Sequence, residues 1–217
     1  MKEKTTLEVT LDEAREWYNS GNETLKELSL KAFDGNELKL PSFSEIKTFE
    51  DAVKVLGMDI DDANSIVSGI KKTSKATAAM CQLSLIRKAL NLRQNLQLAK
   101  EPRYYYIYCP CNPFTNNCST YYDDDIARGD MEIIGKVKKG CEEYIVLGGS
   151  AYNGGTAEFG DFNSYFASYY GVGNANFGLL GCASEEIAKH FSKYFGMLIT
   201  EAKYGDLPDF QITERIY

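Results

Sequence analysis

Residues 184–205 read SEEIAKHFSKYFGMLITEAKYG and carry the strongest helix signal in the chain. Ser184 is a favourable N-cap, and Glu185 and Glu186 complement the positive end of the helix dipole. Gly205 is expected to close the helix in the left-handed conformation. The apolar positions recur at helical spacing and form one continuous face: Ile187, Phe191, Tyr194, Phe195, Leu198, Ile199 and Ala202. Such a face predicts a helix that lies across a sheet.

The sequence before this helix changes character near residue 102. Fourteen of the fifteen tyrosines lie after that point, together with many glycines and asparagines. Aromatic and β-branched runs at 104–108, 131–137 and 141–147 predict strands, and a turn joins the last two. We therefore predict an α+β fold with a helical N-terminal half and a C-terminal antiparallel sheet covered by a long terminal helix.

Before residue 102, Leu, Ala, Lys and Glu recur at helical spacing. Thr10 and Glu13 have the form of a capping box, in which each satisfies a free N–H group at the helix start. Thr48 is expected to cap a further helix, and Ser74 a long one that runs to about Leu98. The predicted segments are an N-terminal helix hairpin over 1–40, a helical segment over 41–101, and a Tyr/Gly-rich α+β domain over 102–217.

The net charge of −7 is unevenly distributed, with −1 in residues 1–102 and −6 in residues 103–217. An acidic C-terminal half would repel phosphate backbones, so we expect no nucleic-acid binding. No apolar run approaches the roughly 20 residues that span a bilayer, and the polar N-terminus does not resemble a signal peptide. We expect a cytoplasmic protein without membrane association.

Cys109, Cys111 and Cys118 form the one cluster that invites a metal or redox interpretation. Zinc sites use four Cys or His ligands, typically in two close pairs, and the spacing here does not fit that pattern. A fourth ligand would have to come from Cys141, Cys182 or His190. We therefore predict no metal and no cofactor, and keep a metal- or thiol-dependent enzyme centred on this cluster as an alternative.

Cys182 lies just before a predicted helix N-terminus, where a thiolate can be favoured. His190 could serve as its base, but it lies about two turns into the helix, roughly 10 Å along the axis. The two side chains cannot meet in that register. The sequence therefore predicts no catalytic residue.

Tyrosine, phenylalanine, asparagine and glycine dominate the stretch from Tyr152 to Phe177. These residue types are typical of adaptable recognition surfaces, because rigid rings supply contact area and small polar groups supply hydrogen bonds. Strand alternation would place about half of the rings in the core instead. Four tyrosines are predicted to bind a ligand or partner: Tyr152, Tyr165, Tyr169 and Tyr170.

Several stretches resemble uncharacterised proteins carried by phages and mobile elements of gut Bacteroidetes. They are LDEAREWYNSGNETL at 11–25, SLIR at 84–87, YYYIY at 104–108 and SEEIAKHF at 184–191. The resemblance implies a phage or prophage origin. It implies no activity and no site residues, because no function is assigned to that group.

Together these patterns predict a non-enzymatic, phage-associated binding or adaptor protein that recognises a protein partner through its C-terminal α+β domain. The alternatives are the metal- or thiol-dependent enzyme and a virion or assembly component, which would form a defined oligomer. The sequence leaves the oligomeric state open.

Overall fold

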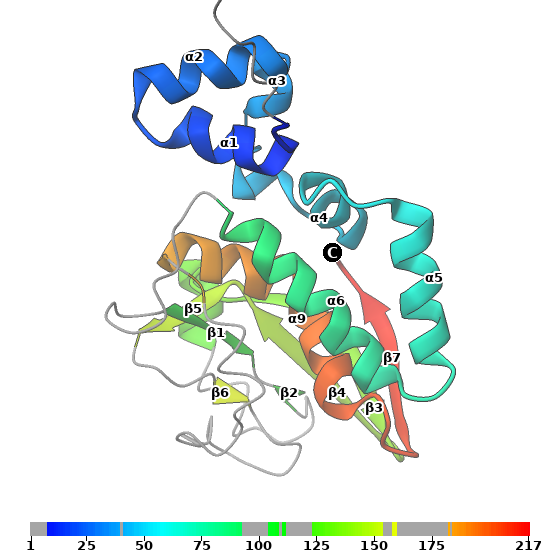
Figure 1. Ribbon diagram of the computed structural model, residues 1–217. Helices are drawn as coiled ribbons and strands as arrows, with labels where there is room; N and C mark the ends of the chain where they lie inside the picture. The colour runs from blue at the N-terminus through cyan, green and yellow to red at the C-terminus, as the bar shows by residue number, and fades with distance from the viewer. Residues whose placement is uncertain are drawn as a thin grey trace, which may run out of the picture. The chain divides into compact units, whose positions relative to one another are not determined.

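A computed structural model describes residues 8–39, 41–92, 104–108, 110–111, 123–153, 158–159, 182 and 184–217 (Figure 1). For residues 104–108, 110–111, 150–153 and 158–159 only the backbone is described. The chain divides into two compact units, Met1–Ser42 and Phe43–Tyr217. Each unit is described separately below.

The N-terminal unit is the predicted helix hairpin. Helices α1 (Leu11–Asn19) and α2 (Glu23–Ala32) pack together, and the short α3 (Gly35–Leu38) contacts both. Thr10 and Glu13 form the expected capping box, and the Asn22 side chain accepts from the first N–H groups of α2. Ala14, Ser29 and Leu38 are buried in this unit.

The second unit begins with helices. A 3-10 turn, η1 (Phe43–Glu45), leads into α4 (Phe49–Val55), α5 (Ile60–Lys71) and α6 (Lys75–Leu90), which pack on one another. Their N-caps are Thr48, Asp59 and Ser74, and the caps at Thr48 and Ser74 are the predicted ones.

The prediction that the helix opened by Ser74 reaches about Leu98 is wrong, because α6 ends at Leu90. The amide of the Asn91 side chain donates to the Arg87 carbonyl, and the Asn91 backbone leaves helical geometry with φ −100° and ψ 10°. The side chain thus takes a carbonyl at the helix end, which is how asparagine competes with helical hydrogen bonding.

A four-stranded antiparallel sheet has the order β2-β4-β3-β7. Its strands are β2 (Pro110–Cys111), β3 (Glu132–Lys139), β4 (Glu142–Gly148) and β7 (Phe210–Arg215). A second sheet has the order β5-β1-β6, with β1 (Tyr104–Tyr108), β5 (Ser150–Asn153) and β6 (Glu158–Phe159). In it β1 pairs antiparallel with β5 and parallel with β6.

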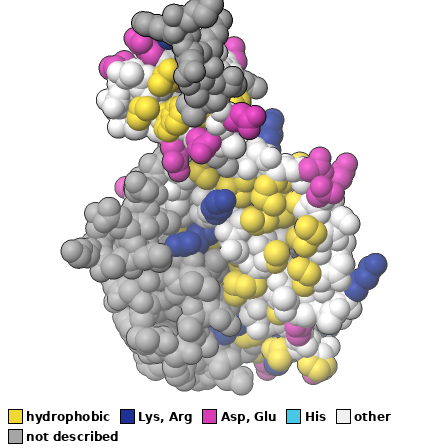
Figure 2. All heavy atoms as spheres, in the orientation of Figure 1, with side chains coloured by type: hydrophobic (Ala, Val, Ile, Leu, Met, Phe, Trp, Pro, Cys, Tyr) yellow, Lys and Arg dark blue, Asp and Glu magenta, His cyan; other side chains and the backbone are white. Residues whose placement is uncertain are grey.

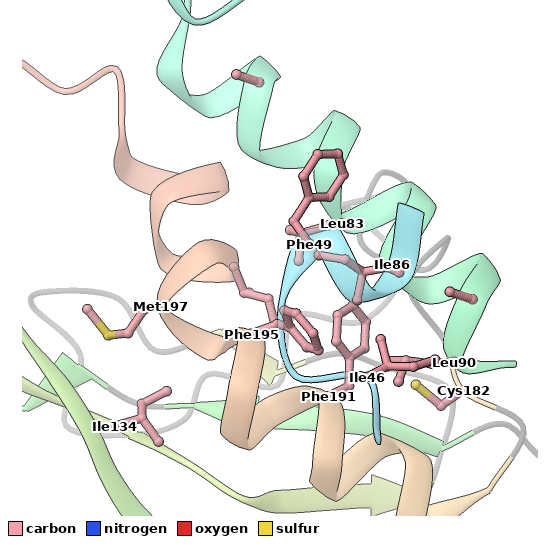
Figure 3. Close-up of a cluster of buried hydrophobic side chains, with 14 of the residues drawn as sticks. Ile46, Phe49, Leu83, Ile86, Leu90, Ile134, Cys182, Phe191, Phe195 and Met197 are labelled. Carbon is pink, nitrogen blue, oxygen red and sulfur yellow. The ribbon is translucent and has the colours of Figure 1, made fainter. Parts of the chain in front are cut away.

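The long helix α9 (Glu185–Tyr204) lies between the sheets and α6. Its residues contact β1, β3, β4, β5 and β7 on one side and α6 on the other, as Figure 1 shows. Phe191 and Phe195 meet Ile46, Phe49, Leu83 and Ile86 in a common core (Figure 3). The α+β fold with a helical N-terminal half and a helix-covered sheet is confirmed.

The structure adds a strand that the sequence analysis did not predict. After α9 the chain turns and returns as β7, which pairs with β3 from Gly135↔Arg215 to Lys139↔Phe210. Residues on either side of the expected boundary at 101/102 also share one core, since α6 packs on α9. The change in composition is therefore not a boundary between cores.

On the face shown in Figure 2, hydrophobic side chains gather over the helices of the second unit. In α5, Ala63 and Val67 are buried, whereas Ile60 and Ile66 remain 38% and 58% exposed. The helix therefore carries apolar groups on more than its core face.

Helix α9 packs tightly on the sheet around Ile134. This fully buried residue occupies a register shift between β3 and β4, and its side chain lies against Gly148 and Gly196. A Cβ atom at position 148 would stand 2.6 Å from the Ser192 carbonyl oxygen and 2.9 Å from Ile134 Cδ1. The Ser192 hydroxyl accepts from the Gly149 N–H at 3.0 Å, which ties the helix to the end of β4.

Gly205 ends α9, but the prediction of a left-handed conformation is wrong. Its φ of −60° and ψ of −23° are right-handed helical values. A Cβ atom at 205 would lie 2.5 Å from the Glu201 carbonyl oxygen and 3.2 Å from Lys75 Cβ. Glycine is favoured here because space is short where α9 meets the start of α6.

The close approach predicts that Gly148→Ala destabilises the protein by about 1–3 kcal/mol, because a backbone carbonyl cannot move aside as a flexible side chain can. Urea denaturation would measure the free energy of unfolding. The matched control is Gly69→Ala in α5, where a Cβ atom meets nothing within 4 Å. That variant should gain about 0.5–1 kcal/mol from better helix propensity. Equal stability of the two variants would contradict the described contact.

Candidate functional site

The structure places few of the residues predicted to form a site. Tyr152 lies in β5 opposite Tyr105 of β1, but nothing is described of its side chain. Tyr165, Tyr169 and Tyr170 lie outside the described residues. Whether these four tyrosines form one surface stays a prediction.

Of the three cysteines predicted as an alternative centre, the structure describes only one. Cys111 lies in β2, paired with Ile145 of β4, whereas Cys109 and Cys118 lie outside the described residues. Within the part of the chain that the structure describes, no group of three or more His, Cys, Asp or Glu side chains could hold a metal ion.

A different group of aromatic side chains does come together on the second unit. It consists of Phe43, Lys47, His190, Lys193, Tyr194 and Tyr217, and is called the aromatic–lysine cluster here. On α9, His190, Lys193 and Tyr194 share a face because they stand three and four residues apart. Residues from η1, from the segment before α4 and from the segment after β7 complete the cluster.

Four rings of the cluster form a continuous row. The Phe43 and His190 centroids are 5.5 Å apart with planes at 79°, and His190 and Tyr194 are 4.5 Å apart. Tyr194 and Tyr217 follow at 5.3 Å and 63°. Edge-to-face contacts of this kind are favourable beyond simple burial, so the rings hold one another in place.

Two lysines lie over the tyrosine rings. The Lys47 ammonium is 5.4 Å from the Tyr194 centroid, and the Lys193 ammonium is 4.9 Å from that of Tyr217. These distances are within the range of cation–π attraction. Each lysine lies over a ring that belongs to another segment of the chain. The cluster therefore places positive charge next to aromatic surface.

Glu132 of β3 anchors one side of the cluster. Lys193 Nζ donates to its Oε1 at 2.7 Å, and the Tyr217 hydroxyl donates to its Oε2 at 2.5 Å. The hydrogen bond from Lys193, followed by that from Tyr217, lowers the pKa of Glu132. The same carboxylate raises the pKa of Lys193 and of Tyr217. At neutral pH the site therefore holds a carboxylate, an ammonium and a neutral phenol.

His190 is half-buried in the row of rings, with Nε2 2.7 Å from the Ile46 carbonyl oxygen. A carbonyl only accepts, so Nε2 carries the proton and donates. Burial lowers the pKa of His190, and the nearby charges of Lys47 and Lys193 act in the same direction. The imidazole is neutral at pH 7, and its Nε2 is engaged with the backbone rather than with a metal or a thiol.

Cys182 is completely buried in the core beside Leu90 and Ile46 (Figure 3). Burial raises the pKa of its thiol to about 12, against the opposing effects of Arg87 and Asn91. The group therefore remains a thiol at neutral pH, in line with the expectation that it is not a nucleophile.

Sequence reasoning missed the aromatic–lysine cluster for a definite reason. Tyr194 was assigned to the apolar face of the helix, and its contacts come from segments about 150 residues before it and 23 after it. The one local signal was the spacing of His190, Lys193 and Tyr194 on a single helix face.

No protein-family model, curated protein or solved structure was found to match this chain. The phage-associated family named above therefore stays a prediction from the quoted stretches. Among the described residues, no helix combines the length and apolar character needed to cross a membrane.

The lowered pKa of His190 predicts that stability falls in acid. Below its ordinary pKa of 6.5 the unfolded chain binds a proton that the folded protein does not, so unfolding is favoured by at most about 1.4 kcal/mol per pH unit. Thermal denaturation from about pH 8 to about pH 5 would measure this loss. His190→Gln keeps a donor for the Ile46 carbonyl but cannot titrate, so its stability should fall less between these pH values. Parallel plots of stability against pH for the variant and wild type would contradict the lowered pKa of His190.

Burial of Cys182 predicts a very slow reaction with iodoacetamide in the native protein. Its thiolate fraction at about pH 8 should be about 1000-fold below that of a thiol with the ordinary pKa of 9.0. Peptide mapping by mass spectrometry would compare it with Cys141, which is exposed. After denaturation the two should react alike. Equal alkylation of both in the folded protein would be incompatible with the described core.

Proposed function

We propose that this chain is a non-enzymatic binding or adaptor protein, of phage or prophage origin, that recognises a protein partner through its C-terminal α+β domain. The observation that carries the proposal is the aromatic–lysine cluster. The resemblance of the quoted stretches to phage-borne proteins supports the origin.

The cluster has properties that favour recognition. Its rings are held by one another and by Glu132, so binding them costs little conformational entropy. Tyrosine is among the residues that contribute most at protein interfaces, and Tyr217 is 43% exposed. The surface is therefore available and already ordered.

The charges of the cluster indicate the chemistry of the partner. Lys47 and Lys193 supply two cations, and the Glu132 carboxylate pairs with Lys193. A segment that presents a carboxylate beside an apolar side chain would complement both the lysines and the tyrosine rings. We propose that the partner is a protein with such a segment.

The other two functions raised by the sequence are not proposed. A metal- or thiol-dependent enzyme would need Cys109 and Cys118, which lie outside the described residues, whereas His190 already donates Nε2–H to Ile46. A virion or assembly component would be recognised by a defined oligomeric state in solution.

The test is capture of partners by the tagged full-length protein from a lysate of a Bacteroidetes host in which a phage is induced. The captured protein would then be purified, and its Kd measured against wild type and Tyr194→Ala/Tyr217→Ala. We expect the double variant to bind at least about tenfold more weakly, because two interface rings are lost. Tyr217→Phe should lose less, because it keeps the ring.

Leu207→Ala is the matched control, since Leu207 is 37% exposed and lies outside the cluster. It should bind like wild type. A partner that binds the double variant and wild type with the same Kd would rule out this surface as its binding site, and capture of nothing by wild type would contradict the adaptor function.

A further inference from the structure

A pocket with a volume of about 350 Å³ lies at the C-terminal end of α9, among residues of α5, α6, α9 and β7. It shares no residue with the aromatic–lysine cluster. Its lining includes Lys71, Lys75, Glu201, Phe210, Ile212 and Arg215. Volumes of this size accommodate a small organic molecule.

Positive charge dominates the lining. Three of the lining residues are cationic, and the one lining carboxylate, Glu201, is only 8% exposed. Arg215 Nη2 donates to Glu201 Oε2 at 2.6 Å, and Lys71 Nζ lies 3.7 Å from Oε1. These two cations compensate the buried carboxylate, as a carboxylate in such a place requires. Lys75 is then a cation in excess of what Glu201 needs.

One carboxylate outside the lining, Asp206, lies close enough to Lys75 for their charges to interact, and it is hydrogen-bonded to the start of α6. Asp206 accepts from the Ser74 hydroxyl at 2.5 Å and from the backbone N–H groups of Lys75 and Ala76 at 2.7 and 3.2 Å. These hydrogen bonds lower the pKa of Asp206, and the positive charge of Lys75 acts in the same direction. With Glu201 and Asp206 set against Lys71, Lys75 and Arg215, the pocket keeps one positive charge in excess, in a chain whose net charge is −7.

The shape of the donors favours a phosphate over other anions. The Arg215 guanidinium carries five N–H donors in a planar fork, of which Glu201 takes one through Nη2. A fork beside two ammonium groups matches the several oxygens and double charge of a phosphate monoester. Phe210 and Ile212 add an apolar wall.

We propose that this pocket binds a small organic phosphate monoester, with its phosphate at Lys71, Lys75 and Arg215 and its apolar part against Phe210 and Ile212. The site is independent of the partner surface proposed above. A bound ligand would contact α5, α6 and β7 at once and so link these three elements.

Isothermal titration of the full-length protein with phenyl phosphate at about pH 8, where the ester is a dianion, tests the proposal. We expect saturable binding of one ligand per chain. Lys75→Gln removes the charge at nearly constant size and should weaken binding about tenfold. Lys138→Gln is the matched control, because Lys138 is an exposed lysine of β3 that does not line the pocket, and it should bind like wild type.

Two further probes sharpen the result. Benzoate, which has the same ring but a single charge, should bind more weakly than phenyl phosphate, and so should inorganic phosphate, which lacks the ring. Inorganic phosphate binding as tightly as phenyl phosphate would overturn the role of the apolar wall. Absence of saturable binding up to about 10 mM ligand, or equal weakening by both lysine variants, would overturn the site itself.

Discussion

The seating of Ile134 between β4 and α9 is the constraint on which the second unit depends. Its side chain fits only because positions 148 and 196 are glycine, and the register shift in β3 turns it toward the helix. The Ser192–Gly149 hydrogen bond then holds the helix at this distance from the sheet. Because packed interiors tolerate little extra volume, this one contact sets the spacing between the sheet and the helix.

Helix α9 in turn positions both surfaces for which a role is proposed. One of its faces carries His190, Lys193 and Tyr194 near the middle, and Glu201 lies in its last turn. Strand β7 supplies the other half of each site, with Arg215 at the pocket and the segment after it at the aromatic rings. A rigid helix and an adjacent strand therefore hold two chemically different surfaces in one unit.

Local signals predicted much of this fold, and non-local ones did not. The caps at Thr10, Thr48 and Ser184 could be predicted from the sequence because a cap is a contact between residues three positions apart. Strand β7 was missed because its alternation is short and its partner β3 lies some 75 residues earlier. The same reason hid the row of rings, since Tyr217 meets Tyr194 only once β7 has joined the sheet. The four tyrosines predicted from composition remain a prediction.

The hydrogen bonds from the start of α6 to Asp206 join residues 130 to 132 positions apart in the chain. Ser74 can cap its own helix locally, but the second cap exists only after α6 and α9 have docked. Contacts of such long range pay the entropy of closing a large loop before they contribute. The first turn of α6 is therefore expected to become fully ordered late in folding. The Asp206 carboxylate then contributes little to nucleation of the helix and mainly slows its unfolding.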